Sequence, residues 1–117
     1  MYAKKQIGLL VESDANKDKI GTISIATTNK DANHVQRRQQ QRAINNAMIQ
    51  VALMYGRRRF NKGAMIFTLC DRTLHQTPYA KFTDVLRGLT VVCQQAPSHP
   101  KILTTYWHKE IRRRVRK

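Results

Sequence analysis

The chain has 117 residues, which fits one domain, and 41% of them are hydrophobic, which is enough for a small core. Lysine and arginine outnumber aspartate and glutamate by 22 to 7, and the net charge of +15 favours a polyanionic partner, nucleic acid before an anionic membrane. No stretch approaches the ~20 apolar residues of a membrane-spanning helix, and the N-terminus is not a signal peptide, so we expect a cytoplasmic protein outside the membrane.

Residues 1–32 are predicted to form an N-terminal extension, for which two alternatives stay open. Apolar side chains alternate at Ile7, Leu9 and Val11, and a second short alternation follows at residues 23–25. Such alternation is typical of strands, so the segment could fold as a β-hairpin. It could equally be a poorly ordered arm. It carries no recognisable catalytic motif.

A first helix is predicted to begin at His34, with Asn33 as its N-cap. It is polar, and a helix without an apolar stripe must lie on the surface or line a cleft. His34, Arg38 and Arg42 follow one another at steps of four, so they form a cationic column along one side of this helix. The column is either a functional site or a solvated face.

A second helix is predicted between Asn45, which is a good N-cap, and Gly56. Its apolar residues recur at the three- and four-residue spacing of a helix that faces a hydrophobic core. Gly56 stands where a left-handed C-cap is expected. This helix therefore anchors the polar helix before it.

Strands are predicted in the second half of the chain, where apolar and β-branched residues gather in short runs. These runs lie at residues 64–70, 89–93 and 102–107. The last two are close enough in sequence to form an antiparallel hairpin. Because helices precede strands rather than alternate with them, the order predicts an α+β fold with an antiparallel sheet.

The segments between these elements predict shorter features. Residues 57–62 form a basic connector and residues 71–78 a turn. Residues 79–86 are open between a short helix and an extended piece. Residues 95–100 predict a loop, and residues 109–117 a basic tail that begins as a short helix.

Cys70 and Cys93 both lie in apolar runs, which favours two free, buried thiols over a disulfide. His75, His99 and His108 have no spacing that suits a metal site, and neither cysteine has a histidine beside it. We therefore predict no metal and no other cofactor.

Several motifs between residues 33 and 117 together resemble a small bacterial family of domains of unknown function. The helical part matches at His34, Arg38, the run Arg42-Ala43-Ile44-Asn45, and Tyr55-Gly56. The strands match in order at Lys62-Gly63-Ala64, Leu86-Arg87-Gly88-Leu89, Val91-Val92 and Ile102-Leu103-Thr104-Thr105-Tyr106, followed by a basic tail. The chain departs from the family at Ala43, where the family has glycine. It also departs at residues 96–100, where the family has an acidic turn and this chain has none.

This family is grouped with the barnase–EndoU–colicin–RelE superfamily of small nuclease and toxin domains. The resemblance implies an α+β domain at residues 33–117, in which two N-terminal helices pack on a curved antiparallel β-sheet. It also implies a toxin-like, metal-independent endoribonuclease with a cognate acidic antitoxin or immunity protein. The matched polar positions, and so the implied catalytic residues, are His34, Arg38, Arg42, Thr104 and Tyr106.

These residue types suit RNA cleavage by attack of the 2′-hydroxyl on the phosphodiester. A histidine can accept or donate a proton near neutral pH, and arginines supply fixed charge and paired donors to a phosphoryl group. Thr104 and Tyr106 alternate onto the same face of their strand, so they could orient the phosphate or His34. Thr104 could also be only a strand former, and Tyr106 could close the core.

Two basic runs predict a surface that binds RNA. The residues expected to contact phosphate are Arg57, Arg58, Arg59, Lys62, Arg112, Arg113, Arg114 and Arg116. Two alternatives to the enzyme stay open: a non-catalytic module that binds RNA or DNA, and a toxin of the same fold that acts on a protein target. A charge run is also often only a solvated face.

Overall fold

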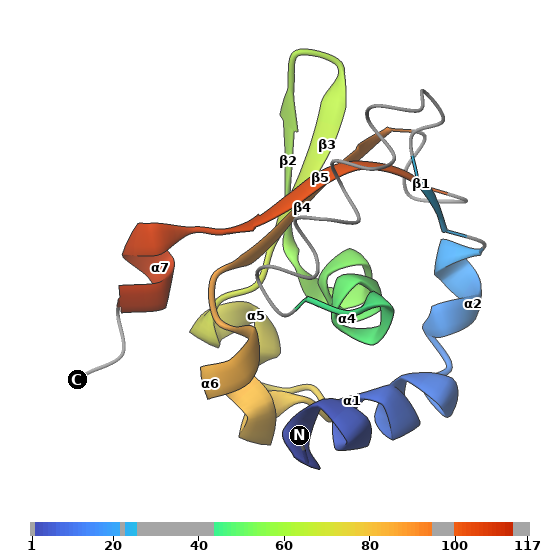
Figure 1. Cartoon of the computed structure of the whole chain (residues 1–117), viewed down its shortest axis with the longest axis vertical. Coiled ribbons are helices and arrows are strands. Elements are labelled where there is room, and N and C mark those ends of the chain that lie inside the picture. The colour runs from blue at the N-terminus through green and yellow to red at the C-terminus, as the bar shows by residue number, and fades with distance from the viewer. Residues whose placement is uncertain (1, 22, 26–43, 95–99, 114–117) are drawn as a thin grey trace.

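A computed structural model describes residues 2–21, 23–25, 44–94 and 100–113 (Figure 1). The described chain is a mixed α+β structure in which α4 lies between a twisted sheet and α1. The elements run in the order α1 (Tyr2–Glu12), α2 (Lys17–Ile20), β1 (Ser24–Ile25), α4 (Asn46–Tyr55), β2 (Arg57–Asn61), β3 (Ala64–Thr68), α5 (Asp71–Leu74), η1 (Ala80–Phe82), α6 (Thr83–Leu86), β4 (Leu89–Gln94), β5 (Lys101–Trp107) and α7 (Lys109–Arg113).

The sheet has the strand order β1-β5-β4-β3-β2, with β2 at one edge. Strands β2 to β5 pair antiparallel with their neighbours, while the two-residue strand β1 pairs parallel with β5. The predicted α+β class with an antiparallel sheet is therefore confirmed for these four strands. The parallel edge strand was not predicted.

Helix α4 confirms the predicted second helix. The Asn45 side chain accepts a hydrogen bond from the Met48 backbone nitrogen at 2.9 Å, as an N-cap should. The helix packs on β3 and β4. The predicted left-handed C-cap is wrong, because Gly56 is extended, with φ −69° and ψ 155°. A glycine is needed there for another reason: a Cβ would lie 2.5 Å from the Ala52 carbonyl oxygen.

Helix α1 forms where the sequence suggested a hairpin or an arm, so the hairpin alternative for this segment is wrong. Ile7 and Val11 are buried in the core, and Ala3 and Leu10 pack against it. These four positions have helical spacing, and Leu9, which made the run look alternating, is 60% exposed on the other side. Packing against α4 therefore selects the helical period over the strand period.

Residues 57–61 form strand β2, so the prediction of a basic connector at residues 57–62 is wrong. Asn61 pairs with Ala64 across a two-residue turn, in which Lys62 has φ 52° and Gly63 has φ 82°. Two consecutive positive φ values are the geometry of a type I′ turn, which joins antiparallel strands tightly. The turn brings Arg57–Asn61 back along β3 as an edge strand.

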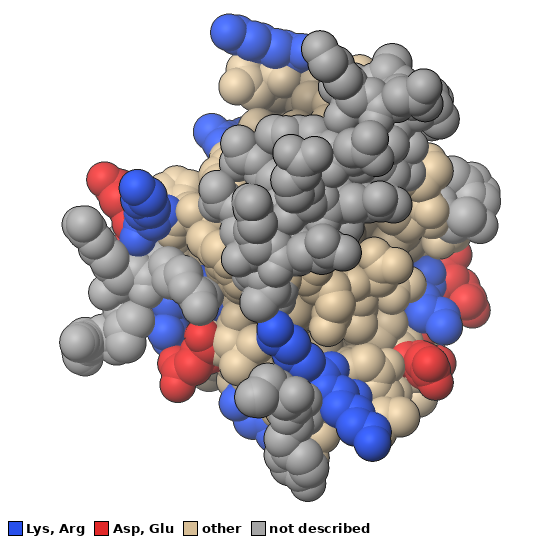
Figure 2. Space-filling view, viewed as in Figure 1, with Lys and Arg blue, Asp and Glu red and all other residues tan. Residues whose placement is uncertain are grey.

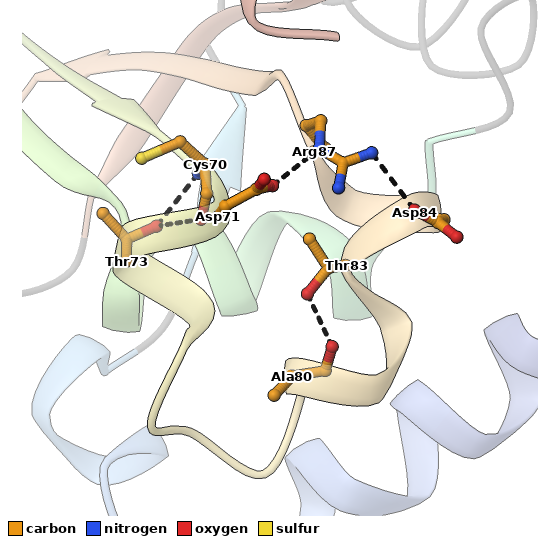
Figure 3. Close-up of polar contacts among 7 residues, drawn as sticks. All are labelled: Cys70, Asp71, Thr73, Ala80, Thr83, Asp84 and Arg87. Carbon is orange, nitrogen blue, oxygen red and sulfur yellow. Dashed lines mark hydrogen bonds and ion pairs between the residues drawn. The ribbon is translucent and has the colours of Figure 1, made fainter. Parts of the chain in front are cut away.

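Three short helical elements, α5, η1 and α6, lie between β3 and β4, and Figure 3 shows the contacts that hold them. The segment predicted as a turn begins with the one-turn helix α5, where Thr73 Oγ1 accepts from the Cys70 nitrogen and donates to the Cys70 carbonyl oxygen. Residues 80–86 are helical, so the helical alternative is confirmed there. Arg87, only 8% exposed, donates to Asp71 at 2.6 Å and to Asp84 at 3.1 Å.

The predicted β4–β5 hairpin and the helical start of the tail, α7, are confirmed. A bulge lies opposite Val92 and Cys93, because Cys93 pairs with Ile102 and Val92 with Thr104. The predicted loop at residues 95–100, except for its last residue, and the predicted helix from His34 fall outside the described residues.

The core fills the sheet face that α4 covers, which we call the inner face. It includes Phe67, Leu89, Val91 and Ile102 from three strands, together with the buried residues of α1 and α4. We call the opposite face the outer face. Both cysteines are free thiols as predicted, but only Cys93 is buried. Burial raises the pKa of Cys93 to about 11.

Candidate nucleic-acid interface

Strand β2 presents an unbroken row of exposed side chains. Arg57, Arg58 and Arg59 are all exposed, and Phe60 is 71% exposed. The hairpin that β2 forms with β3 projects from the body of the molecule, and its turn carries the exposed Lys62 (Figure 1). Figure 2 shows basic side chains at the projecting end of the molecule. The four predicted cations of this run therefore lie on one exposed hairpin.

These cations have no acidic partners in the described part of the chain. The ion pairs found there are both made by Arg87, which joins Asp71 and Asp84. No acidic side chain of the described residues thus competes with a ligand for Arg57, Arg58 and Arg59. An exposed aromatic ring beside unpaired arginines is the combination that binds the bases and the backbone of single-stranded nucleic acid.

The register of the hairpin divides these side chains between the two faces of the sheet. Arg58 pairs with Phe67, which belongs to the core, so its side chain lies on the inner face. Arg57 pairs with Thr68 and Arg59 pairs with Ile66, so both arginines lie on the outer face. An extended strand alternates in this way because successive side chains point to opposite faces.

Thr104 and Tyr106 lie on the outer face with Arg57 and Arg59. Tyr106 pairs with Thr90, whose Oγ1 lies 3.4 Å from Thr68 Oγ1, and Thr68 pairs with Arg57. In the next row, Thr104, Val92, Ile66 and Arg59 are successive cross-strand partners. Both residues are half-buried, and the interpretation of Tyr106 as a core-closing residue does not fit its place on the outer face.

A hollow of about 460 Å³ lies where β2, α5 and α7 meet. Arg57 and Arg72 line it, together with His108 and Glu110. His108 Nδ1 accepts a hydrogen bond from the Ile111 nitrogen at 3.4 Å, at the start of α7. Figure 2 shows acidic and basic side chains next to each other around α7. The hollow therefore joins a histidine and a carboxylate to two arginines.

Sequence reasoning missed this hollow. His108 comes two residues after Tyr106, which comes two residues after Thr104, so continuing the strand alternation would have placed the three on one side. Arg72 and Glu110 gave no such signal, because they lie on short helices that only the fold brings to Arg57.

Most of the other predicted site residues lie outside the part of the chain that the structure describes. His34, Arg38 and Arg42, as well as Arg114 and Arg116, fall outside the described residues. Arg112 and Arg113 belong to α7, and only the backbone of these two residues is described. The predicted convergence of five catalytic side chains is thus tested only for Thr104 and Tyr106, which do share a face.

The described residues provide neither a membrane-spanning helix nor a metal-binding cluster. None of the helices described is both long enough and apolar enough to cross a membrane. In the same part of the chain, no three His, Cys, Asp or Glu side chains gather closely enough to hold a metal ion.

Comparison with protein-family models, with curated proteins and with solved structures finds no match to this chain. The resemblance to the barnase–EndoU–colicin–RelE superfamily therefore stays a prediction from the motifs.

Proposed function

We propose that this protein binds single-stranded RNA through the β2–β3 hairpin. The observation that carries the proposal is the composition of the edge strand β2. Its three consecutive arginines have no acidic partner among the described residues, and a largely exposed phenylalanine follows them. Arginine forks match phosphate oxygens, and an aromatic ring stacks on unpaired bases of any sequence. The overall charge of +15 adds long-range attraction to a polyanion.

RNA is preferred over double-stranded DNA because of Phe60. A ring that is 71% exposed can stack on a base only where that base is unpaired, and unpaired bases are the usual target of sequence-specific RNA recognition. The resemblance to nuclease domains points to RNA as well.

A charged edge strand has another explanation, since arginine and lysine on an edge prevent pairing between sheets of different molecules.

The experiment compares the affinity of purified protein for a fluorescent single-stranded RNA before and after Arg57, Arg58 and Arg59 are all changed to glutamine. The proposal predicts binding that is at least about tenfold weaker in the variant. A control changes Lys4, Lys5 and Lys81, which lie on α1 and η1 away from the hairpin, and should weaken binding much less. Equal affinities for wild type and the arginine variant, with more self-association in the variant, would favour the edge-protection explanation.

Metal-independent RNA cleavage, on a RelE- or barnase-like fold, is the second proposal. It is supported by the shared face of Thr104, Tyr106 and the two outer arginines, and by the hollow that joins His108 and Glu110 to Arg57. The 2′-oxygen would attack phosphorus as the bond to the 5′-oxygen breaks, which leaves a 2′,3′-cyclic phosphate and a 5′-hydroxyl. One side chain takes the 2′ proton and another protonates the leaving oxygen.

The cleavage proposal is tested in EDTA with wild type and the single variants His34→Ala, Arg38→Ala and His108→Ala. Loss of product only with His34→Ala and Arg38→Ala supports the site inferred from the motifs. Loss of product with His108→Ala would mean that the reaction takes place in the hollow. No product from wild type at high protein concentration supports the non-catalytic RNA-binding module. Growth arrest on expression with intact cellular RNA would instead support a toxin that acts on a protein.

An acidic antitoxin or immunity protein would bind the same basic hairpin, because opposite charges direct such complexes. The partner proposal predicts that a small acidic protein is encoded by a neighbouring gene. Expressing the two proteins together should abolish RNA binding. RNA binding that the acidic protein leaves unchanged would contradict the shared surface.

A further inference from the structure

A second hollow lies on the inner side of the hairpin, between α2, α4 and β2. Its volume is about 280 Å³. Its apolar lining comes from Leu53, Met54 and Phe67, and the exposed cations Arg58 and Lys19 line it as well. Small-molecule sites start at roughly 300 Å³, so the hollow is of a size for one small flat ligand. Arg58 and Lys19 belong to none of the ion pairs found among the described residues.

The remaining polar wall of this hollow is Asn16, whose amide is held in one orientation. The Tyr55 hydroxyl donates to Asp14 Oδ2 at 2.9 Å, so the Tyr55 oxygen must accept, and Asn16 Nδ2 donates to it at 2.9 Å. The Tyr79 hydroxyl also donates to Asp14 Oδ2, at 2.9 Å. This network assigns the Asn16 amine to Tyr55 and leaves the Asn16 Oδ1 acceptor without a partner in the described structure.

The two tyrosines keep this arrangement fixed. Burial, with further effects from Asp14, raises the pKa of Tyr55 and the pKa of Tyr79. Both hydroxyls therefore stay protonated and remain donors at physiological pH. Their rings are also in contact, with centroids 5.6 Å apart. An acceptor that is positioned by such a network can discriminate ligands by their N–H groups.

We propose that this hollow binds one unpaired nucleobase of an RNA strand whose backbone lies along β2. The base would lie against Leu53, Met54 and Phe67, an N–H of the base would donate to Asn16 Oδ1, and Arg58 and Lys19 would contact the adjoining phosphates. Phe60 lies on the same face of β2 as Arg58, two residues further along, where it can stack on the next base. The inference rests on the proposed RNA binding and adds the base-binding site.

The test uses adenosine monophosphate and ribose 5-phosphate, which share the phosphate and the sugar but differ by the base. Titration is followed by the NMR signals of the methionine methyl groups, among which Met54 reports on the hollow. We expect adenosine monophosphate to bind about tenfold more tightly or better, since a stacked base contributes roughly 1–3 kcal/mol, and to shift the Met54 signal. Equal affinity for the two ligands, or no shift of Met54, would overturn the proposal.

Neighbouring arginines on β2 supply a matched pair of variants. Arg58→Gln, on the inner face, should weaken binding of the mononucleotide severalfold, whereas Arg59→Gln, on the outer face, should leave it unchanged. Leu53→Phe, which fills the hollow, should abolish the preference for the base. Equal effects of the two arginine variants would mean that only general charge is sensed, and would overturn the site.

The two proposals fail in different ways. If single-stranded RNA binds through the arginines of β2 but the mononucleotide does not enter the hollow, only the base-binding site is overturned. If the mononucleotide shifts Met54 but the RNA does not bind, the site is a nucleotide site unconnected with RNA, and the inference as stated is overturned together with the proposed function.

Discussion

Arg58 and Arg59 are adjacent on β2, yet Arg58 pairs with Phe67 and lies on the inner face, while Arg59 pairs with Ile66 and lies on the outer face. The strand can thus present positive charge to both sides of the sheet at once. On the inner side the charge borders a small apolar hollow, and on the outer side it shares a face with Thr104 and Tyr106. A nucleic-acid strand along this edge can therefore contact the arginines of both faces.

Phe60 is predicted to contribute to binding but not to folding. Phe60→Ala should weaken binding to single-stranded RNA by about 5- to 150-fold, which corresponds to the ~1–3 kcal/mol of one stacked base. The free energy of unfolding should change little, because the ring is 71% exposed. Leu9→Ala removes a similarly exposed apolar side chain from α1 and should leave RNA affinity unchanged. Anisotropy titrations and urea unfolding measure the two quantities.

Thr105 is predicted to limit stability. Its Oγ1 is buried on the inner face and has no hydrogen-bond partner in the described structure. Thr105→Val keeps the shape and removes the unsatisfied hydroxyl, so the free energy of unfolding should rise by about 1 kcal/mol. Thr90→Val is the matched change in the neighbouring strand, where Oγ1 donates to the Gly88 carbonyl at 3.2 Å. It should lower stability, and equal effects of both changes in urea unfolding would contradict this explanation.

Tyr79 is predicted to make the protein less stable in alkali. The pKa of the buried hydroxyl is raised, chiefly by burial and then by its hydrogen bond to Asp14. Below pH 10 the folded and unfolded chains both hold the proton. Above it the unfolded chain loses the proton while the folded chain keeps it, so stability falls as pH rises, by about 1.4 kcal/mol for each pH unit.

Urea unfolding at pH 9 and at pH 11 measures this dependence. Tyr79→Phe should be less stable than wild type at pH 9, because the bond to Asp14 is lost, and should lose less stability between the two pH values. The same loss in both proteins would show that Tyr79 is not the group responsible.

The buried position of Arg87 is predicted to depend on its contact with Asp71. Asp71→Asn weakens the 2.6 Å contact to the Arg87 side chain, which is only 10% exposed, and should destabilise the fold by about 1–2 kcal/mol. The estimate is at the low end for buried charges because the Asp71 side chain is 60% exposed. Asp18→Asn, an exposed carboxylate on α2, should have little effect. Thermal unfolding of the two variants checks the difference.

The parts of the fold that could be predicted are those whose local signals agree with their packing. Asn45 predicted the start of α4, and the β-branched runs predicted β4 and β5, because a cap and a buried strand leave clear patterns. Strand β2 left none, since an exposed edge strand has no apolar face. The Ile7–Val11 run fits both the strand period and the helix period, and only packing against α4 decides between them.

The candidate sites were less predictable than the fold. The basic run at residues 57–59 was evident from charge alone, but its division between two faces needed the register with β3. The two hollows are assembled from segments far apart in sequence, such as Arg57 with His108, or Asn16 with Arg58. No local pattern connects such residues, so they could not be predicted without the topology.

The salt dependence of RNA binding is the most direct test of the central claim. Each lost phosphate contact should reduce the slope of log affinity against log salt by about 0.7 for single strands. The glutamine variant of Arg57, Arg58 and Arg59 should therefore show a slope smaller than wild type by about 2, while the variant of Lys4, Lys5 and Lys81 keeps the wild-type slope. Identical slopes for wild type and the arginine variant would contradict RNA binding through β2.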